Sequence, residues 1–141
     1  MKSTLFPAED DCFAIRQAAR YVSQLYDRHL AQVGLTTTQF SIMGRIRRAR
    51  RTTMKALADQ MVMQRTTLVR AIQPLRRDGL VFSETLEPDR RELSIGLTEA
   101  GEARILVARE HWYAAQEEFE KRFGPERAKA LRRELFAMTR D

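Results

Sequence analysis

One short stretch of the sequence alternates between apolar and other residues, whereas apolar residues elsewhere recur every three or four positions. The alternating stretch runs through Leu93, Ser94, Ile95, Gly96 and Leu97. A period of two is typical of a β-strand with one buried face, and a period near 3.6 is typical of an amphipathic helix. The sequence therefore predicts a mainly α fold with one small β-hairpin, whose other strand lies in residues 80–86.

Helical periodicity predicts six helices around this hairpin. They cover about residues 10–31, 37–48, 55–60, 64–78, 98–123 and 126–139. Asp10, Thr53 and Thr98 are suited to be N-caps, because their side-chain oxygens can accept bonds from free helical amides. Gly79 is suited to a left-handed helix end. No internal repeat or flexible linker divides the chain, so we expect one intertwined domain.

Basic residues are concentrated in the middle of the chain, which has a formal net charge of +6. Residues 45–97 hold twelve basic and six acidic residues, and the segment on either side of them is neutral. Within residues 45–77 there are ten basic residues and one acidic residue, Asp59. This pattern indicates a polyanion as the partner of the centre. A basic surface with no partner is the alternative.

The order of helix, turn, helix and hairpin predicts a winged helix-turn-helix in residues 37–97, with residues 64–78 as the recognition helix. Leu68, Ile72 and Leu75 would seat that helix in the core. Its opposite face carries hydrogen-bonding side chains, namely Arg65, Thr66, Thr67, Arg70 and Gln73. Arginine can bind guanine and glutamine can bind adenine in the major groove. Double-stranded DNA is therefore the predicted partner.

Two further arginine pairs can be explained either by DNA contact or by a simpler structural role. Arg90 and Arg91, at the predicted hairpin tip, can enter a minor groove, or they can simply keep the tip soluble. Arg76 and Arg77 suit the end of a helix through the helix dipole alone, so we expect phosphate contacts from them at most.

The two ends of the chain, residues 1–36 and 98–141, carry more apolar surface than a domain of residues 37–97 requires. Their large apolar residues include Trp112, Phe119, Phe123 and Phe136. The simplest use of this surface is a homodimer in which both ends interlock. Such a dimer would place two recognition helices about one DNA turn apart on a near-palindromic operator. A monomer with extra core helices is the alternative.

Few features suit catalysis, metal binding or membrane insertion. The chain has one cysteine and two histidines, and no group of them has zinc-ligand spacing. The glycine spacing between Gly96 and Gly101 lacks the lysine of a phosphate-binding loop.

No apolar run exceeds about four residues, and the start lacks a signal-peptide core. We expect a cytoplasmic protein that is not an enzyme and uses no cofactor. An RNA-binding or protein-docking module is the rival interpretation.

At this point the sequence resembles the multiple-antibiotic-resistance regulator (MarR) family. The resemblance rests on GLTTTQFSIM (34–43), LADQMVMQRTTLVRAIQPLRRDGLV (57–81) and DRRELSIGLTEAG (89–101). It implies an obligate dimer joined through terminal helices, with a winged helix on each protomer. It also implies DNA release by a small effector or by oxidation. In the family motif Asp89 would brace the wing, and Arg90 or Arg91 would probe the minor groove.

The resemblance implies two possible signals. A small aromatic or phenolic anion would release a repressor from its operator, and Arg16, Tyr26 and His29 are candidate contacts, with His111 and Trp112 behind them. One branch of the family instead senses organic hydroperoxides through a single cysteine, and Cys12 has that position. Two tyrosines of that branch are replaced here by Arg16 and Thr37. Cys12 also fits an apolar stripe with Ile15 and Ala19, so inert packing stays open.

Overall fold

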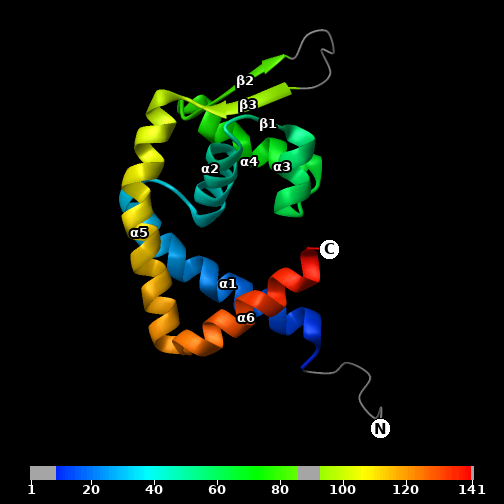
Figure 1. Ribbon diagram of the computed structural model, residues 1–141, viewed down its shortest axis with the longest axis vertical. Helices are drawn as coiled ribbons and strands as arrows, with labels where there is room; N and C mark the ends of the chain where they lie inside the picture. The colour runs from blue at the N-terminus through cyan, green and yellow to red at the C-terminus, as the bar shows by residue number, and fades with distance from the viewer. Residues whose placement is uncertain (1–8, 86–92, 141) are drawn as a thin grey trace.

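A computed structural model describes residues 9–85 and 93–140 and confirms the predicted fold class (Figure 1). Helices dominate, and one small antiparallel sheet lies between them. The elements in order are α1 (Asp11–Leu30), the short 3-10 helix η1 (Ala31–Val33), α2 (Thr37–Ala49), β1 (Thr52–Thr53), α3 (Met54–Met61), α4 (Arg65–Arg77), β2 (Val81–Thr85), β3 (Leu93–Leu97), α5 (Glu99–Phe123) and α6 (Pro125–Thr139).

Polar caps start four of the helices. Asp10, Thr53 and Thr98 cap α1, α3 and α5, as predicted, by accepting a hydrogen bond from an amide three residues on. The cap of α2 is Thr36, whose Oγ1 lies 3.1 Å from the amide nitrogen of Gln39. The predicted end of α4 is also confirmed, because Gly79 has a φ of +73°. These ends fix where each helix turns.

The sheet has a third strand that the sequence did not reveal. Its order is β1-β3-β2, so β3 is central. Antiparallel pairing joins Val81 to Leu97 on one side of β3 and Thr52 to Ile95 on the other. The expectation of one buried face for β3 is therefore wrong, since Ser94 and Gly96 are buried as well as Ile95. The Phe82 ring leaves no room for a side chain at position 96.

The main core lies where α2, α3, α4, the sheet and the start of α5 meet. Its fully buried members include Leu30, Ile42, Ile46, Leu57, Leu68, Ile72, Leu75 and Ile95. From this lobe α5 runs to the far end of the molecule, where α1 and α6 lie (Figure 1). Within the described residues, no helix is both long and apolar enough to cross a membrane.

The terminal helices leave apolar side chains uncovered in the single chain. Residues 11–21 of α1 are all exposed, including Cys12, Ile15 and Ala19. On α6 the large apolar residues are also exposed, namely Leu131, Leu135, Phe136 and Met138. The interpretation of Cys12 as a packed residue of the chain's own core is wrong, because no element of the described chain covers that face of α1.

Candidate nucleic-acid interface

The recognition helix α4 has the two faces that the sequence predicts. Leu68, Ile72 and Leu75 are at most 1% exposed and attach the helix to the core. The contact residues predicted on this helix are all exposed, namely Arg65, Thr66, Thr67, Arg70 and Gln73. The helix thus presents a row of donors and acceptors on a rigid support, as direct contact with base edges requires.

The N-terminus of α4 is open to an anion. Its cap residue, Gln64, makes no side-chain capping bond, and the first turn contains no acidic residue. The free amides of that turn therefore point outward with the positive end of the helix dipole. A phosphate group is one of the anions that such a helix end suits. Thr66 and Thr67 lie in this first turn, where a contact with phosphate or with a thymine methyl group remains a prediction.

The turn between α3 and α4 sets the angle at which α4 is presented. Val62 occupies a left-handed conformation with a φ of +52°, which is rare for a β-branched residue. The next amide, that of Met63, bonds to the carbonyl oxygen of Ala58 at 2.9 Å and closes the end of α3. Both ends of α4 are therefore held by backbone geometry.

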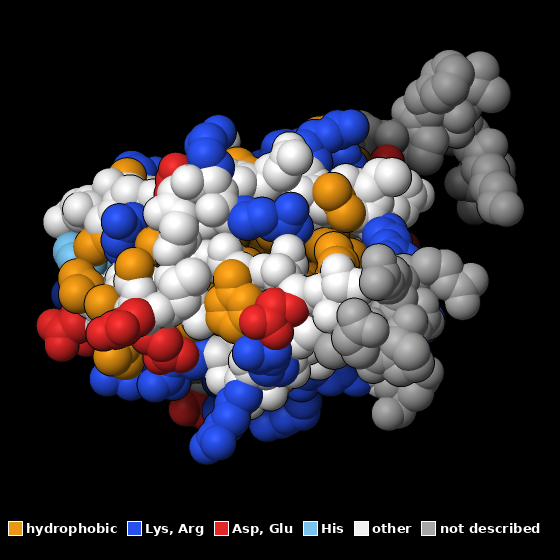
Figure 2. Space-filling model, turned by 90° about the horizontal axis from the view of Figure 1, so that it is seen from above, with side chains coloured by type: hydrophobic (Ala, Val, Ile, Leu, Met, Phe, Trp, Pro, Cys, Tyr) orange, Lys and Arg blue, Asp and Glu red, His pale blue; other side chains and the backbone are white. Residues whose placement is uncertain are grey.

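Ion pairs in this lobe involve arginines other than those of the outward face of α4. Arg47 pairs with Glu102 at 3.0 Å, and Arg51 pairs with Glu84 at 2.9 Å. Within residues 9–85 and 93–140, no carboxylate forms an ion pair with Arg65 or Arg70. The sheet-bearing end of the molecule shows Lys and Arg over much of its surface, while several acidic side chains gather at one edge (Figure 2).

The remaining predicted DNA contacts belong to the hairpin tip. Asp89, Arg90 and Arg91 lie outside the described residues. Up to Thr85 and from Leu93, the two strands are paired in register, and the Arg51–Glu84 pair links β2 to the residue before β1. The roles of the three tip residues remain predictions.

The four candidate effector residues do not gather at one place. Tyr26 lines a cavity of about 650 Å³ between α1, α5 and α6, and burial raises its pKa, with the charge of Glu120 acting in the same direction. His29 instead lies 2.7 Å from the carboxylate of Glu118 and joins α1 to α5. Arg16 and Cys12 are exposed and line neither this cavity nor the one described next.

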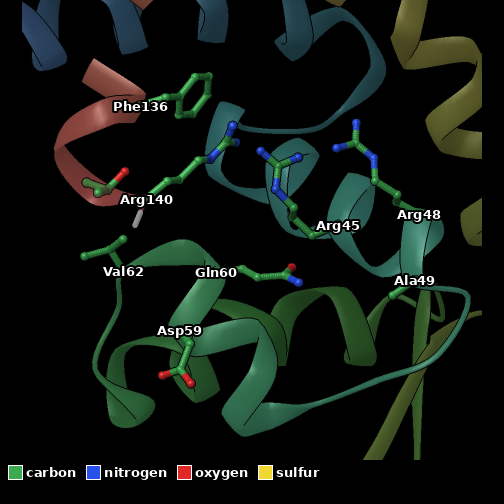
Figure 3. Close-up of a pocket in the computed structure, with 9 residues that line it drawn as sticks. Arg45, Arg48, Ala49, Asp59, Gln60, Val62, Phe136 and Arg140 are labelled. Atoms are coloured by element: carbon green, nitrogen blue, oxygen red, sulfur yellow. The ribbon is translucent and has the colours of Figure 1, made fainter. Parts of the chain in front are cut away.

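A second cavity, of about 450 Å³, separates the end of α6 from α2 and α3 (Figure 3). Its polar lining includes Arg45, Arg48 and Arg140. The sequence did not reveal this cavity. Arg140 comes from the opposite end of the chain, and no local pattern pairs it with Arg45. Among the described residues, no group of His, Cys, Asp and Glu is arranged to hold a metal ion.

Comparison with known proteins connects this geometry to transcription regulators. The sequence profile of the MarR family matches residues 33–92, which hold α2, α3, α4 and β2. The regulator SarZ of Staphylococcus epidermidis is 27% identical over 90 residues. That match covers 64% of this chain and 61% of SarZ, so it spans less than two thirds of the relative's length.

Solved structures extend the likeness over nearly the whole chain. The Mycobacterium tuberculosis transcriptional regulator MosR, in complex with DNA, is 37% identical with a TM-score of 0.81. The alignment covers 93% of this chain and 94% of that one. NadR, in complex with 4-hydroxyphenylacetate, has a TM-score of 0.74 over 97% of this chain and 98% of its own. Its identity of 20% supports a likeness of fold.

Proposed function

Because the chain belongs to the MarR family of DNA-binding transcription regulators, we propose that it is a dimeric repressor that binds a near-palindromic operator through α4. The observation that carries the proposal is the division of α4 into a fully buried apolar face and an exposed face whose two arginines form no ion pair within the described residues. The likeness to MosR, solved in complex with DNA, supports the same interpretation. We expect it to act in the cytoplasm.

Five exposed residues of α4 have proposed roles. Arg65 and Arg70 would bind guanine through two hydrogen bonds each, and Gln73 would bind adenine. Thr66 and Thr67, at the open helix end, would contact phosphate or a thymine methyl group. Beyond α4, we propose that Arg90 and Arg91 of the wing enter the adjacent minor groove.

Dimerisation would use the helices at both ends of the chain, in residues 1–36 and 98–141. The support is the apolar surface that α1 and α6 leave exposed, including Ile15 at 46% and Leu135 at 42%. Both residues line the cavity of about 650 Å³ between α1, α5 and α6. A symmetry-related copy that buried this surface would use the same patch on both protomers.

The proposed release signal is a small aromatic or phenolic anion. NadR, whose fold is similar, binds 4-hydroxyphenylacetate. Among the predicted contacts, Tyr26 lines a cavity, whereas His29 is engaged by Glu118. Tyr26 is therefore the best supported of the four candidates.

Oxidation of Cys12 is the alternative release signal, because this cysteine is exposed. In the single chain, its position in the first turn of α1 leaves the thiol open to an oxidant. In this alternative an organic hydroperoxide would oxidise Cys12 and so release the operator.

One titration distinguishes these alternatives. Wild type and Cys12→Ser would be titrated in a gel shift on the DNA upstream of the gene, under reducing conditions, with cumene hydroperoxide and with 4-hydroxyphenylacetate. Release by peroxide that a thiol reverses, and that Cys12→Ser lacks, would establish the redox signal. Release by the phenolic acid in both proteins would establish the small-anion signal. The absence of a sequence-specific complex in every condition would contradict the proposed function.

A further inference from the structure

Three side chains form a cluster on the outer face of the small sheet. Arg51 directly precedes β1, and Phe82 and Glu84 belong to β2. The guanidinium carbon of Arg51 lies 4.9 Å from the centre of the Phe82 ring, and its Nη1 lies 2.9 Å from Oε2 of Glu84. Phe82 and Glu84 point away from the core side of β2, where Val81 is buried, because side chains alternate along a strand. We call Arg51, Phe82 and Glu84 the wing-base cluster.

Two backbone features bring the wing-base cluster together. Gly96 of β3 lies opposite Phe82, and a Cβ atom there would come within 2.7 Å of the Phe82 ring. The backbone oxygen of Arg50 lies 3.6 Å from the same position. Arg50 itself has a φ of +67°, which residues other than glycine seldom adopt. The missing side chain at Gly96 and the unusual turn at Arg50 thus let the ring and the chain before β1 meet, and this places Arg51 against the ring.

Folding stability gives little reason for the ion pair of this cluster. The side chains of Arg51 and Glu84 are 53% and 58% exposed, and an ion pair at such a surface contributes little to stability. Its place in the DNA-binding lobe matters more. Among the residues of the three described strands, Glu84 is the one that carries a charge, and Figure 1 shows β2 extending out from the helices of the lobe. A carboxylate there repels phosphate and neutralises Arg51, so it lowers affinity for DNA.

We propose that Glu84 determines specificity, because it holds Arg51 back from DNA of unrelated sequence. Sequence-independent binding depends on how many cations can reach phosphates in any orientation, so a free Arg51 would add to it. In the operator complex the base contacts of α4 fix the orientation, and Arg51, on the outer face of the sheet, would add little. The Phe82 ring keeps the guanidinium beside Glu84 through a cation–π contact. This inference rests on the proposed function, since it needs α4 to prefer one sequence.

Fluorescence anisotropy of the full chain tests this role on two duplexes of equal length. One is the duplex that the wild type enriches most from a random pool, and the other is a scrambled version of it. Glu84→Gln should bind the scrambled duplex at least about five-fold more tightly at about 0.1 M salt, with a salt slope steeper by about one. Its affinity for the enriched duplex should stay within about two-fold of the wild type, so specificity falls. The melting temperature should not change, because the ion pair is exposed.

Two further variants assign the effect to Arg51. Adding Arg51→Gln to Glu84→Gln restores the net charge of the wild type, and this double variant should lose the gain on the scrambled duplex. Glu102→Gln is the matched control, since Glu102 pairs with Arg47 at 3.0 Å and joins α2 to α5 rather than to the sheet. It makes the same change in net charge as Glu84→Gln and should alter neither affinity by more than about two-fold.

Four results would overturn the role of Glu84. They are an unchanged affinity of Glu84→Gln for the scrambled duplex, a gain that persists in the double variant, an equal gain in Glu102→Gln, and an equal gain on the enriched duplex. The proposed function fails in a different way, when the wild type enriches no sequence from the pool. A random duplex then takes the place of the scrambled one, and a gain by Glu84→Gln that the double variant loses would still show that Glu84 restrains Arg51.

Discussion

The exposed side chains of α4 differ in the information that each can read from DNA. Arg70 lies in the middle of the outward face, where a guanidinium can reach a guanine edge. Arg70→Ala should cost about 1–3 kcal/mol of operator binding and relax base preference at one position. Fluorescence anisotropy on the operator and on single-base variants measures both effects.

The control for Arg70 is Arg76, which is also exposed but lies in the last turn of α4. Arg76→Ala should weaken every duplex alike and lower the salt dependence of binding, as the loss of a phosphate contact does. If Arg70→Ala also lowers binding uniformly, Arg70 does not read a base.

The ion pairs of Glu118 connect the stability of the protein to pH. A hydrogen bond with His29 lowers the pKa of Glu118 below its usual 4.5, and the charges of Arg122 and Arg28 act in the same direction. A carboxylate with a depressed folded pKa stabilises the protein above pH 4.5 and loses that contribution as the pH falls through the folded pKa. Glu118→Gln should therefore unfold at lower denaturant concentration than wild type at pH 7, and this difference should shrink below pH 4.5. Chemical denaturation from pH 3 to 7 measures it.

The neighbouring Glu117 is exposed and provides the control, because it pairs with none of the described residues. Glu117→Gln should leave the pH profile nearly unchanged. A Glu118→Gln difference that stayed constant down to pH 3 would show that the ion pair does not stabilise the contact of α1 with α5.

The start of α5 lies in backbone contact with the winged lobe. A Cβ atom on Gly101 would lie 2.1 Å from the carbonyl oxygen of Leu80, so α5 and the start of β2 touch through backbone. Gly101→Ala should lower the free energy of unfolding by about 3 kcal/mol or more, because backbone would have to move. Thermal and urea denaturation followed by circular dichroism provide the measurement.

The matched substitution at Gly44 should not destabilise the protein. Gly44 lies inside α2, and a Cβ atom there would meet nothing within 4 Å. Gly44→Ala should be neutral or stabilise the protein by about 0.5–1 kcal/mol through helix propensity. Equal destabilisation by both changes would mean that the contact with Leu80 is not the cause.

The elements were largely predictable because their signals are local. Periodicity and caps predicted the bounds of all six helices to within about two residues, and Gly79 predicted the end of α4. Strand β1 was missed because its two threonines also fit a helix cap, a role that Thr53 fills as well. Ser94 and Gly96 were expected at the surface because pairing on both sides of β3 is not visible in the sequence of β3 itself.

The candidate functional residues were predictable where one helix carries them and not where the fold brings distant segments together. The buried and exposed faces of α4 followed from spacing alone. The sequence did not predict the arginine cavity because Arg45 and Arg140 are far apart in the chain. They line one cavity only because α5 and α6 return the end of the chain toward α2. The positions of the effector candidates also depend on distant segments of the chain. His29, for example, contacts Glu118 of α5 and does not line an open site.

At the scale of the whole molecule, we propose that a second copy of the chain buries the exposed apolar surface of the terminal helices. Ile15 lines the apolar cavity and is 46% exposed in the single chain. Ile15→Glu should weaken dimerisation by about 3 kcal/mol or more, because both copies lose apolar contact and would bury a carboxylate. Sedimentation velocity should show a monomer at concentrations where wild type is a dimer.

The same charge placed on the other lobe is the control for Ile15. Ala56 is exposed on α3, and Ala56→Glu should leave the sedimentation of the wild type unchanged. If the wild type sediments as a monomer at every concentration, the terminal helices serve a purpose other than the one proposed.

The central claim is that two copies of α4 read a symmetric DNA site, and enrichment of bound duplexes from a random pool tests it most directly. We expect an inverted repeat whose half-sites lie about one helical turn apart, because a two-fold dimer imposes its symmetry on the DNA. The Arg70→Ala variant should recover the same repeat with one position relaxed. Enrichment of no sequence, or of a single unrepeated half-site by the wild type, would contradict the claim.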